Sequence, residues 1–250
     1  TTLQVQAQTP VPLRRLKPGA ISLSVSNSGS AAAHNLSLVI QSANPPGGVS
    51  GSMICDSTQT GTWRCRRGGL EAAAETTVNF DWATLPNSST LEVSANLTFD
   101  GGTPVPLNLS LPLLETYASW SSGIGNPAES ADPDQDGISN LLEYAFGGSP
   151  VVVSASDANG NPLTPRIQIS GNHIQFIHRR RTDTAARGLI YQVETTEDPA
   201  SESWSESLPS GSGISSAPMV PPSADFEQVT VSIPISSARR FLRLKVALSE

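Results

Sequence analysis

The stretches AISLSVS (residues 20–26) and NLSLVIQ (residues 35–41) decide the fold class of this chain. In both stretches every second side chain is apolar, and most of the side chains between them are polar. A period of two is typical of a β-strand that buries one face and exposes the other. The turn-forming residues Asn-Ser-Gly at 27–29 lie between the stretches, which are therefore predicted to be two strands joined through a turn.

Similar alternating segments, divided by turn clusters, fill most of the chain. In residues 1–116 the further candidates are 1–9, 77–83, 90–99 and 104–113. In residues 150–250 the candidates are 166–170, 173–179, 189–196, 227–234 and 239–248. Short strands at this spacing predict β-sandwiches. We therefore expect an all-β chain with two sandwich domains, 1–116 and 150–250, joined by a linker at 117–149.

The acidic charge of the chain is concentrated in the expected linker. The formal net charge is −7, and residues 117–149 contain five acidic side chains and no basic one. Residues 1–116 and residues 150–250 each carry only −1. An acidic balance argues against nucleic acid as a partner, because nucleic-acid binders are basic. No apolar run approaches the roughly 20 residues of a membrane helix, and the opening TTLQVQAQTP lacks a signal peptide, so we expect a processed chain without a membrane span.

The two cysteines, Cys55 and Cys65, are separated by nine residues. This spacing is too long for a redox CxxC motif, and two cysteines are too few for a structural zinc site. We interpret the pair as a disulfide between neighbouring strands, which would place the protein in an oxidising compartment. The alternative interpretation is a pair of buried thiols.

The segment DPDQDGISNLLE (132–143) carries the clearest chemical signal, because it matches the calcium-loop pattern D-x-[DN]-x-[DN]-G-x₅-E without a mismatch. Calcium prefers roughly six to eight oxygen ligands. Gly137 occupies the position of the sharp turn. The expected ligands are the side chains of Asp132, Asp134, Asp136, Asn140 and Glu143 and the backbone carbonyl of Ile138.

A helix is expected near 138–146, where apolar residues follow a helical period until two glycines stop it. The alternative to a calcium site is therefore an acidic helix N-terminus, where carboxylates are favourable. The residues before Asp132 contain Gly and Pro and predict no entering helix, unlike a sensor EF-hand. We expect a bound Ca²⁺ to stiffen the junction between the two sandwiches.

No catalytic motif stands out. The three histidines are scattered, and the chain contains no P-loop, HExxH or nucleophile-elbow pattern, so we expect a non-enzymatic protein. Two basic clusters, 179–181 and Arg239-Arg240 with Arg243, lie in the last domain. They are either a patch for a polysaccharide or another anion, or exposed strand ends that pair with nearby acids.

Residues 25–40, VSNSGSAAAHNLSLVI, resemble the N-x-G-x-x-x-A-x-N-[LV] signature of the Ig-like conserved-repeat domains of bacterial surface proteins. Residues 53–80 also fit this family, although AAAE stands before Thr76 where the family is often rich in glycine. The resemblance covers about 80 residues. It implies an extracellular Ig-like sandwich with a Cys55–Cys65 bridge.

Residues 117–250 resemble a carboxy-terminal module of secreted proteins from Verrucomicrobia and their relatives. The shared blocks are ADPDQDGISNLLEYAFGGSP, IQFIHRRR, YQVETTEDPASESW and RRFLRLKV, in this order. The acidic loop is similar to the calcium loops of thrombospondin type 3 and dockerin repeats. The resemblance implies secretion and calcium, but no chemistry.

These features predict a calcium-stiffened, non-enzymatic protein of the bacterial surface or extracellular matrix. Residues 1–9 either pair with a neighbouring subunit and build a homo-oligomer or fibre by strand addition, or form the first strand of their own sandwich. The alternative function is a carbohydrate-binding or adhesin module that uses the Arg clusters and loops of the last domain.

Overall fold

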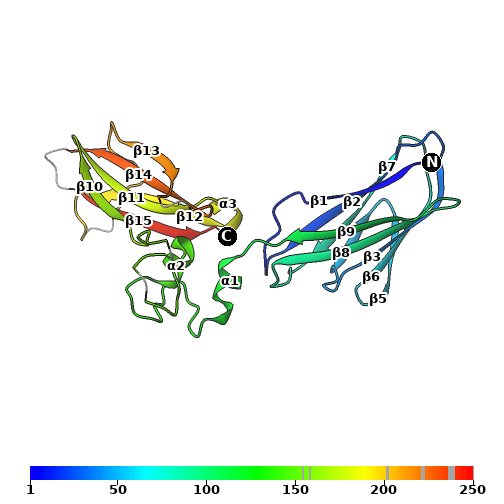
Figure 1. Ribbon diagram of the computed structural model, residues 1–250, viewed down its shortest axis with the longest axis horizontal. Coiled ribbons are helices and arrows are strands. Elements are labelled where there is room, and N and C mark those ends of the chain that lie inside the picture. Colours follow the sequence, from blue (N-terminus) through cyan, green and yellow to red (C-terminus); the bar gives the residue numbers. More distant parts are fainter. Residues whose placement is uncertain (154, 158, 201–202, 221–222, 236–239, 250) are drawn as a thin grey trace. The chain divides into compact units, whose positions relative to one another are not determined.

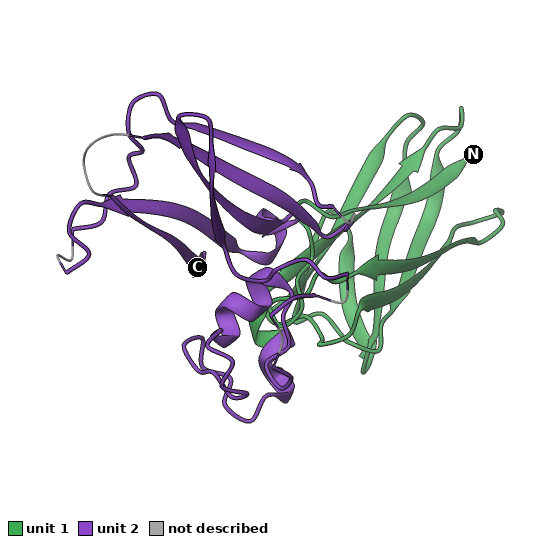
Figure 2. Ribbon diagram, turned by 60° about the vertical axis from the view of Figure 1, so that its left-hand side comes forward, with its two compact units in different colours: residues 1–119 green, residues 120–250 purple. Residues whose placement is uncertain are grey.

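The computed structural model describes residues 1–153, 155–157, 159–200, 203–220, 223–235 and 240–249, and strands dominate it (Figure 1). The all-β prediction is therefore confirmed. The chain divides into two compact units, residues 1–119 and residues 120–250 (Figure 2). The division falls inside the segment expected as a separate linker, 117–149. Residues 117–119 belong to the first unit and residues 120–149 to the second. No helix among the described residues is long and apolar enough to cross a membrane.

The first unit is a sandwich of two antiparallel sheets. One sheet has the order β1 (Leu3–Gln8), β2 (Gly19–Asn27), β7 (Glu75–Trp82), β4 (Gly48–Gly51). The other has the order β5 (Ile54–Gln59), β6 (Thr62–Leu70), β3 (Ala33–Gln41), β8 (Thr90–Thr98), β9 (Val105–Pro112). Leu23 and Val25 from β2 and Leu38 from β3 are fully buried between the sheets. The alternating apolar residues of 20–26 and 35–41, which lie in β2 and β3, therefore point into the same core.

Strand β1 lies in its own sandwich. It pairs with β2 in antiparallel register from Leu3 opposite Asn27 to Gln8 opposite Ser22, and Leu3 belongs to the buried core. This confirms the second of the two expectations for residues 1–9. An exchange of this strand between copies stays a prediction.

The Cys55–Cys65 disulfide is confirmed. The two cysteines are direct neighbours on β5 and β6, and Cys65 is fully buried in the core while Cys55 is half-buried. The bond therefore fastens the edge strand β5 to its sheet.

Removal of this disulfide should destabilise the first unit. A cross-link that closes a loop of about ten residues contributes roughly 2–3 kcal/mol, mainly by restricting the unfolded chain. We expect the Cys55→Ala/Cys65→Ala variant to unfold at a lower denaturant concentration by about this free energy. Chemical denaturation followed by hydrogen exchange checks the result, and an unchanged midpoint for residues 1–119 would contradict it.

The second unit contains two further antiparallel sheets. The larger has the order β10 (Arg166–Ser170), β11 (His173–Arg181), β14 (Phe226–Pro234), β13 (Gly213–Pro218), and the smaller pairs β12 (Leu189–Thr196) with β15 (Phe241–Leu248). Buried Phe176, Val229 and Val231 pack against Val193 and Leu244 between the sheets. Residue 239, expected at the start of the last strand, lies outside the described residues.

Short helices complete the second unit. They are the 3-10 turn η1 (Ser121–Gly123), α2 (Asn140–Phe146) and α3 (Thr184–Arg187), whereas α1 (Tyr117–Trp120) lies across the division and only its last residue belongs to the second unit. Helix α2 is the helix expected near 138–146, and it ends at Gly147, whose φ of 74° lies in the left-handed region. Because glycine has no Cβ, it adopts this conformation without strain and closes the helix.

Candidate metal centre

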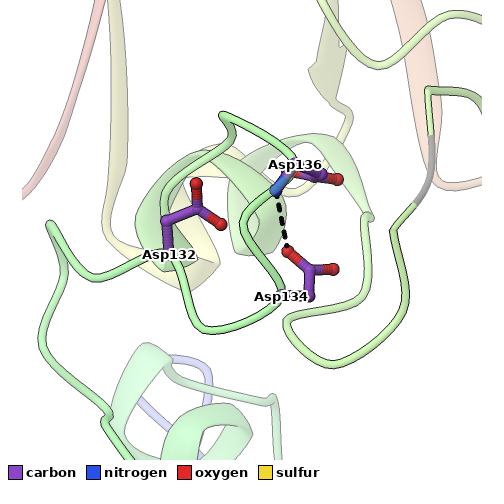
Figure 3. A group of neighbouring side chains, drawn as sticks. All are labelled: Asp132, Asp134 and Asp136. Atoms are coloured by element: carbon purple, nitrogen blue, oxygen red, sulfur yellow. Dashed lines mark hydrogen bonds between the residues drawn. The ribbon is translucent and has the colours of Figure 1, made fainter.

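The acidic loop enters α2 directly. Asp132, Asp134 and Asp136 each place one carboxylate oxygen so that these oxygens all lie within 4.8 Å of one another. Figure 3 shows the three side chains on the curve of the loop, with the bond from the Asp136 N–H to Asp134 Oδ1 (3.4 Å). The structure thus brings together the first three expected ligands.

Backbone donors give the loop its shape. The N–H of Gly137 donates to Asp132 Oδ2 (2.9 Å), and the N–H of Ile138 donates to Asp136 Oδ1 (2.8 Å). Gly137 has a φ of 88°, which allows the chain to turn at the position that the pattern reserves for glycine. Ile138 buries its apolar side chain and can offer only its backbone carbonyl, which is the expected ligand.

Four side-chain oxygens of the expected ligands are buried and have no hydrogen-bond partner in the part of the chain that the structure describes. They are Asp132 Oδ1, Asp134 Oδ2, Asn140 Oδ1 and Glu143 Oε2. Asn140 and Glu143 are 0% and 1% exposed, so these oxygens are shielded from bulk water. A buried polar group left unpaired costs roughly 1–3 kcal/mol, and more if charged. A cation among these oxygens would remove that cost.

Asn140 is already oriented for a ligand role. Its Nδ2 donates to the carbonyls of Asn126 (2.8 Å) and Ala128 (2.9 Å). These two bonds fix the amide, so that Oδ1 is the atom left for another partner. The loop before Asp132, which the sequence indicated only as non-helical, therefore holds one expected ligand in place.

The electrostatics of the loop also favour a cation. Burial, followed by the carboxylates of Asp134, Asp136 and Asp132 in that order, raises the pKa of Glu143 to about 7. Burial and the neighbouring Asp136 also raise the pKa of Asp134. Negative charge gathered in one place, with no base in residues 117–149, therefore opposes its own ionisation.

Calcium and the proton should compete at Glu143. A metal ligand must be deprotonated, and this carboxyl holds its proton up to a pH of about 7 in the absence of metal. We expect the calcium affinity to be constant above pH 8 and to fall by up to about tenfold per pH unit below 7. Calcium titrations between pH 5 and pH 8.5 check this, and an affinity that stays constant down to pH 5 would contradict it.

The first basic cluster pairs with nearby acids, as one of its interpretations predicted, but two of its side chains are not exposed. Arg179 and Arg181 are buried, which corrects the expectation of exposed side chains, because Arg179 lies over the Phe226 ring and Arg181 meets the end of α2. Arg179 forms an ion pair with Asp157 (3.0 Å), and the half-exposed Arg180 pairs with Glu227 (2.6 Å). The cluster therefore serves contacts within the second unit, which the run of three arginines alone does not indicate.

Where the structure describes it, the second cluster is paired as the alternative interpretation predicted; Arg239 lies outside the described residues. Arg243 bonds to Glu194 (2.6 Å) and lies over the Trp204 ring (4.1 Å), and Arg240 approaches Glu197 (3.8 Å). Mainly uncharged polar groups and one carboxylate line a groove of about 450 Å³ in the first unit, formed by the end of β3, parts of β8 and β9, and the β5–β6 turn. Its polar side chains include Gln41, Thr62, Glu92, Ser94 and Asn108.

No family model matches the chain, and no curated protein matches it in sequence. Solved structures show weak likeness to part of it. BslA, a bacterial hydrophobin, is 12% identical with a TM-score of 0.36, over 46% of this chain and 95% of its own. An uncharacterised protein of Nocardia farcinica with an immunoglobulin-like fold is 14% identical with a TM-score of 0.32, over 44% of this chain and 96% of its own.

Two further structures represent different kinds of protein. The collagen-binding subdomain of the Enterococcus faecalis surface protein ACE is 7% identical with a TM-score of 0.32, over 42% of this chain and 92% of its own. A GH20 exo-β-N-acetylglucosaminidase of Vibrio harveyi is 14% identical with a TM-score of 0.29, over 46% of this chain and 18% of its own. The neighbours thus include a protein with an immunoglobulin-like fold, a subdomain of a surface protein and an enzyme, and at these scores they assign neither family nor function.

Proposed function

We propose that this chain is a non-enzymatic structural protein of the bacterial surface or extracellular matrix, and that its acidic loop binds one Ca²⁺. The observation that carries the calcium part is the set of four buried oxygens, all on residues of one loop pattern, that have no hydrogen-bond partner among the described residues. The Cys55–Cys65 bond supports an oxidising location outside the cytoplasm. Calcium would stiffen the segment that follows the first sandwich.

The donor set favours calcium over other common ions. All expected ligands are oxygens from carboxylates, an amide and a backbone carbonyl, which suit hard cations and not the softer zinc or copper ions. Magnesium requires a nearly ideal octahedron and keeps several of its waters. A site with a carboxylate at each of four positions and a fifth side-chain oxygen on Asn140 supplies more protein ligands than magnesium usually accepts.

The non-enzymatic part of the proposal is supported by the contacts of the buried His178. His178 stacks on the Tyr191 ring with an interplanar angle of 13°, and its Nδ1 lies 3.0 Å from the Arg179 carbonyl. Burial lowers the pKa of His178. These contacts support a neutral packing role for this histidine.

Calorimetric titration of the full chain with Ca²⁺ and with Mg²⁺ at pH 8 tests the proposal. We expect one calcium per chain and a much weaker response to magnesium. Extracellular calcium modules have dissociation constants of roughly 10⁻⁴–10⁻³ M, so the titration must reach several millimolar. Absence of saturable calcium binding in that range would refute the calcium part.

Assembly of several copies is the second element of the proposal. Strand β1 lies at the edge of its sheet, and all of its six residues pair with β2. A copy that exchanged this strand with a neighbour would form the same β1–β2 backbone pairs between chains. Exchange would therefore cost little free energy at equilibrium.

Deletion of residues 1–9 should abolish any such assembly. Electron microscopy and sedimentation of the full chain and the shortened chain, each at several concentrations with and without a chelator, provide the comparison. Filaments or oligomers formed by the full chain alone support strand exchange. Equal assembly by both chains would refute it.

The alternative function, carbohydrate binding, has one surface in its favour. The groove in the first unit offers hydroxyl, amide and carboxylate groups that can hydrogen-bond a sugar, and Ser110 holds the pKa of Glu92 below its usual value. A glycan array with the full chain and with the Gln41→Ala/Asn108→Ala variant tests it. Binding that the variant loses supports the groove, and binding that it retains, or an array without binding, refutes it.

A further inference from the structure

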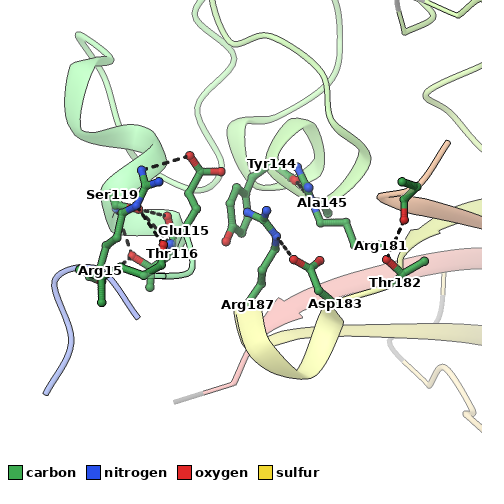
Figure 4. A network of polar contacts seen from close by, with 12 residues as sticks. Arg15, Glu115, Thr116, Ser119, Tyr144, Ala145, Arg181, Thr182, Asp183 and Arg187 are labelled. Carbon is green, nitrogen blue, oxygen red and sulfur yellow. Dashed lines mark hydrogen bonds and ion pairs between the residues drawn. The ribbon is translucent and has the colours of Figure 1, made fainter. Parts of the chain in front are cut away.

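The last turn of α2 is held from outside by side chains of two β-strands. Arg181 of β11 donates from Nε to the carbonyl of Tyr144 (2.8 Å), as Figure 4 shows. Tyr191 of β12 donates from its hydroxyl to the carbonyl of Ala145 (2.7 Å). The preceding carbonyl, that of Glu143, accepts the N–H of Gly148 (2.8 Å). Three consecutive carbonyls at the end of α2 are thus each bound by a different partner.

These contacts fix a helix that could not hold its position alone. Helix α2 has seven residues, and isolated helices of this length are unstable in water. The carbonyls of a last helical turn have no partner within the helix. Arg181 and Tyr191 supply such partners from the sheets, and a cation at this end also complements the helix dipole. The rotation of α2 about its axis is therefore set by β11 and β12.

Aromatic rings complete the clamp around Tyr144. This residue is fully buried, with the Arg181 guanidinium 5.4 Å from its ring centre and the Trp120 ring centre 5.5 Å away. Arg181 also lies 4.8 Å from the centre of the Phe226 ring. The guanidinium is thus enclosed by two rings and bonded to the helix end, which leaves it little freedom.

The clamp acts on the residue next to an expected ligand. Glu143 directly precedes Tyr144, and Asn140 lies one turn earlier on the same helix. Any rotation of α2 would move both side-chain oxygens away from the carboxylates of the loop. We propose that Arg181 and Tyr191 are positioning residues of the calcium site, which they serve through α2 without touching the ion. This inference rests on the calcium binding proposed above.

Three variants test the inference in the full chain. Arg181→Gln removes the charge and the bond to the Tyr144 carbonyl, and Tyr191→Phe removes only the hydroxyl. Arg180→Gln is the matched control, because Arg180 is the neighbour of Arg181 on β11 and pairs with Glu227 instead. Circular dichroism at saturating calcium verifies that each variant folds, and calorimetry measures the dissociation constants for Ca²⁺ and Mg²⁺.

We expect calcium binding to weaken about 10–100-fold in Arg181→Gln, as for partners that orient metal ligands, and several-fold in Tyr191→Phe. Arg180→Gln should bind like the wild type. The ratio of calcium to magnesium affinity should also fall, because a displaced Glu143 can no longer give two oxygens to the larger ion. A variant that is only less stable would weaken both ions by the same factor.

The outcomes separate the two proposals. The positioning role alone would be refuted in either of two cases. In the first, Arg181→Gln and Tyr191→Phe both bind calcium as tightly as the wild type. In the second, they bind calcium more weakly but keep the wild-type ratio of calcium to magnesium affinity. A wild type without calcium binding would refute the proposed function and this inference with it. If Arg181→Gln does not fold, the calcium affinity of Tyr191→Phe and its ratio of calcium to magnesium affinity provide the test instead.

Discussion

The Glu143→Gln variant should lose calcium binding and, without calcium, be more stable than the wild type. The substitution keeps the shape of the side chain but removes one charge and the capacity to give two oxygens to the ion. Removing a ligand should exceed the roughly 10–100-fold cost of changing an outer-shell partner. We therefore expect the dissociation constant to rise by more than about 100-fold.

The gain in stability without calcium follows from the raised pKa. A carboxyl whose pKa is higher in the folded state than in the unfolded state stabilises the fold below its unfolded pKa, and loses this contribution as the pH rises through its folded pKa. For Glu143 the loss lies between about 4.5 and about 7, and it amounts to about 3 kcal/mol at most. Glutamine carries no charge, so the variant avoids the loss at pH 8.

Thermal unfolding at pH 8, with excess calcium and with a chelator, measures both effects. The variant should melt below the wild type in calcium and above it in the chelator. Glu129→Gln is the control, because Glu129 is an exposed acid of the same segment outside the loop pattern. A variant that melts below the wild type in both buffers would contradict the assigned role of Glu143.

The features that could be predicted from the sequence are those carried by local pattern. Alternation located β2 and β3, because the buried positions of a half-buried strand repeat every two residues. The spacing of Asp132, Asp134 and Asp136 located the loop, because the spacing itself brings their oxygens together. Such signals need no knowledge of distant residues.

The missed features depend on contacts between distant residues. Arg181 lies 37 positions from Tyr144, and nothing in the run of three arginines shows which of them meets a helix end. Strand β13, GISSAP, was missed because its residues are exposed throughout and few are strong strand formers. The position of β1 was left open, since an alternating strand can pair equally well in its own sheet or in a neighbour's.

Removal of calcium should destabilise residues 120–250 and leave residues 1–119 unchanged. Every expected ligand and both positioning residues lie in the second unit, whereas the first has its own core and disulfide. An ion at 100 times its dissociation constant stabilises the folded state by about 2.7 kcal/mol. For a unit of this size the chelator should then lower the melting temperature by about 10 °C or more.

Hydrogen exchange resolved by peptide can assign the effect to each unit. With a chelator, amides of α2, β11 and β12 should exchange faster, while those of β2 and β3 keep their protection. Reduction of Cys55–Cys65 gives the opposite pattern, because that bond lies in the first sandwich. Two perturbations that each act on one unit would show that calcium stabilises the second unit specifically. Equal loss of protection in both units under the chelator would instead show that the ion acts on the whole chain, contrary to a site built within residues 120–250.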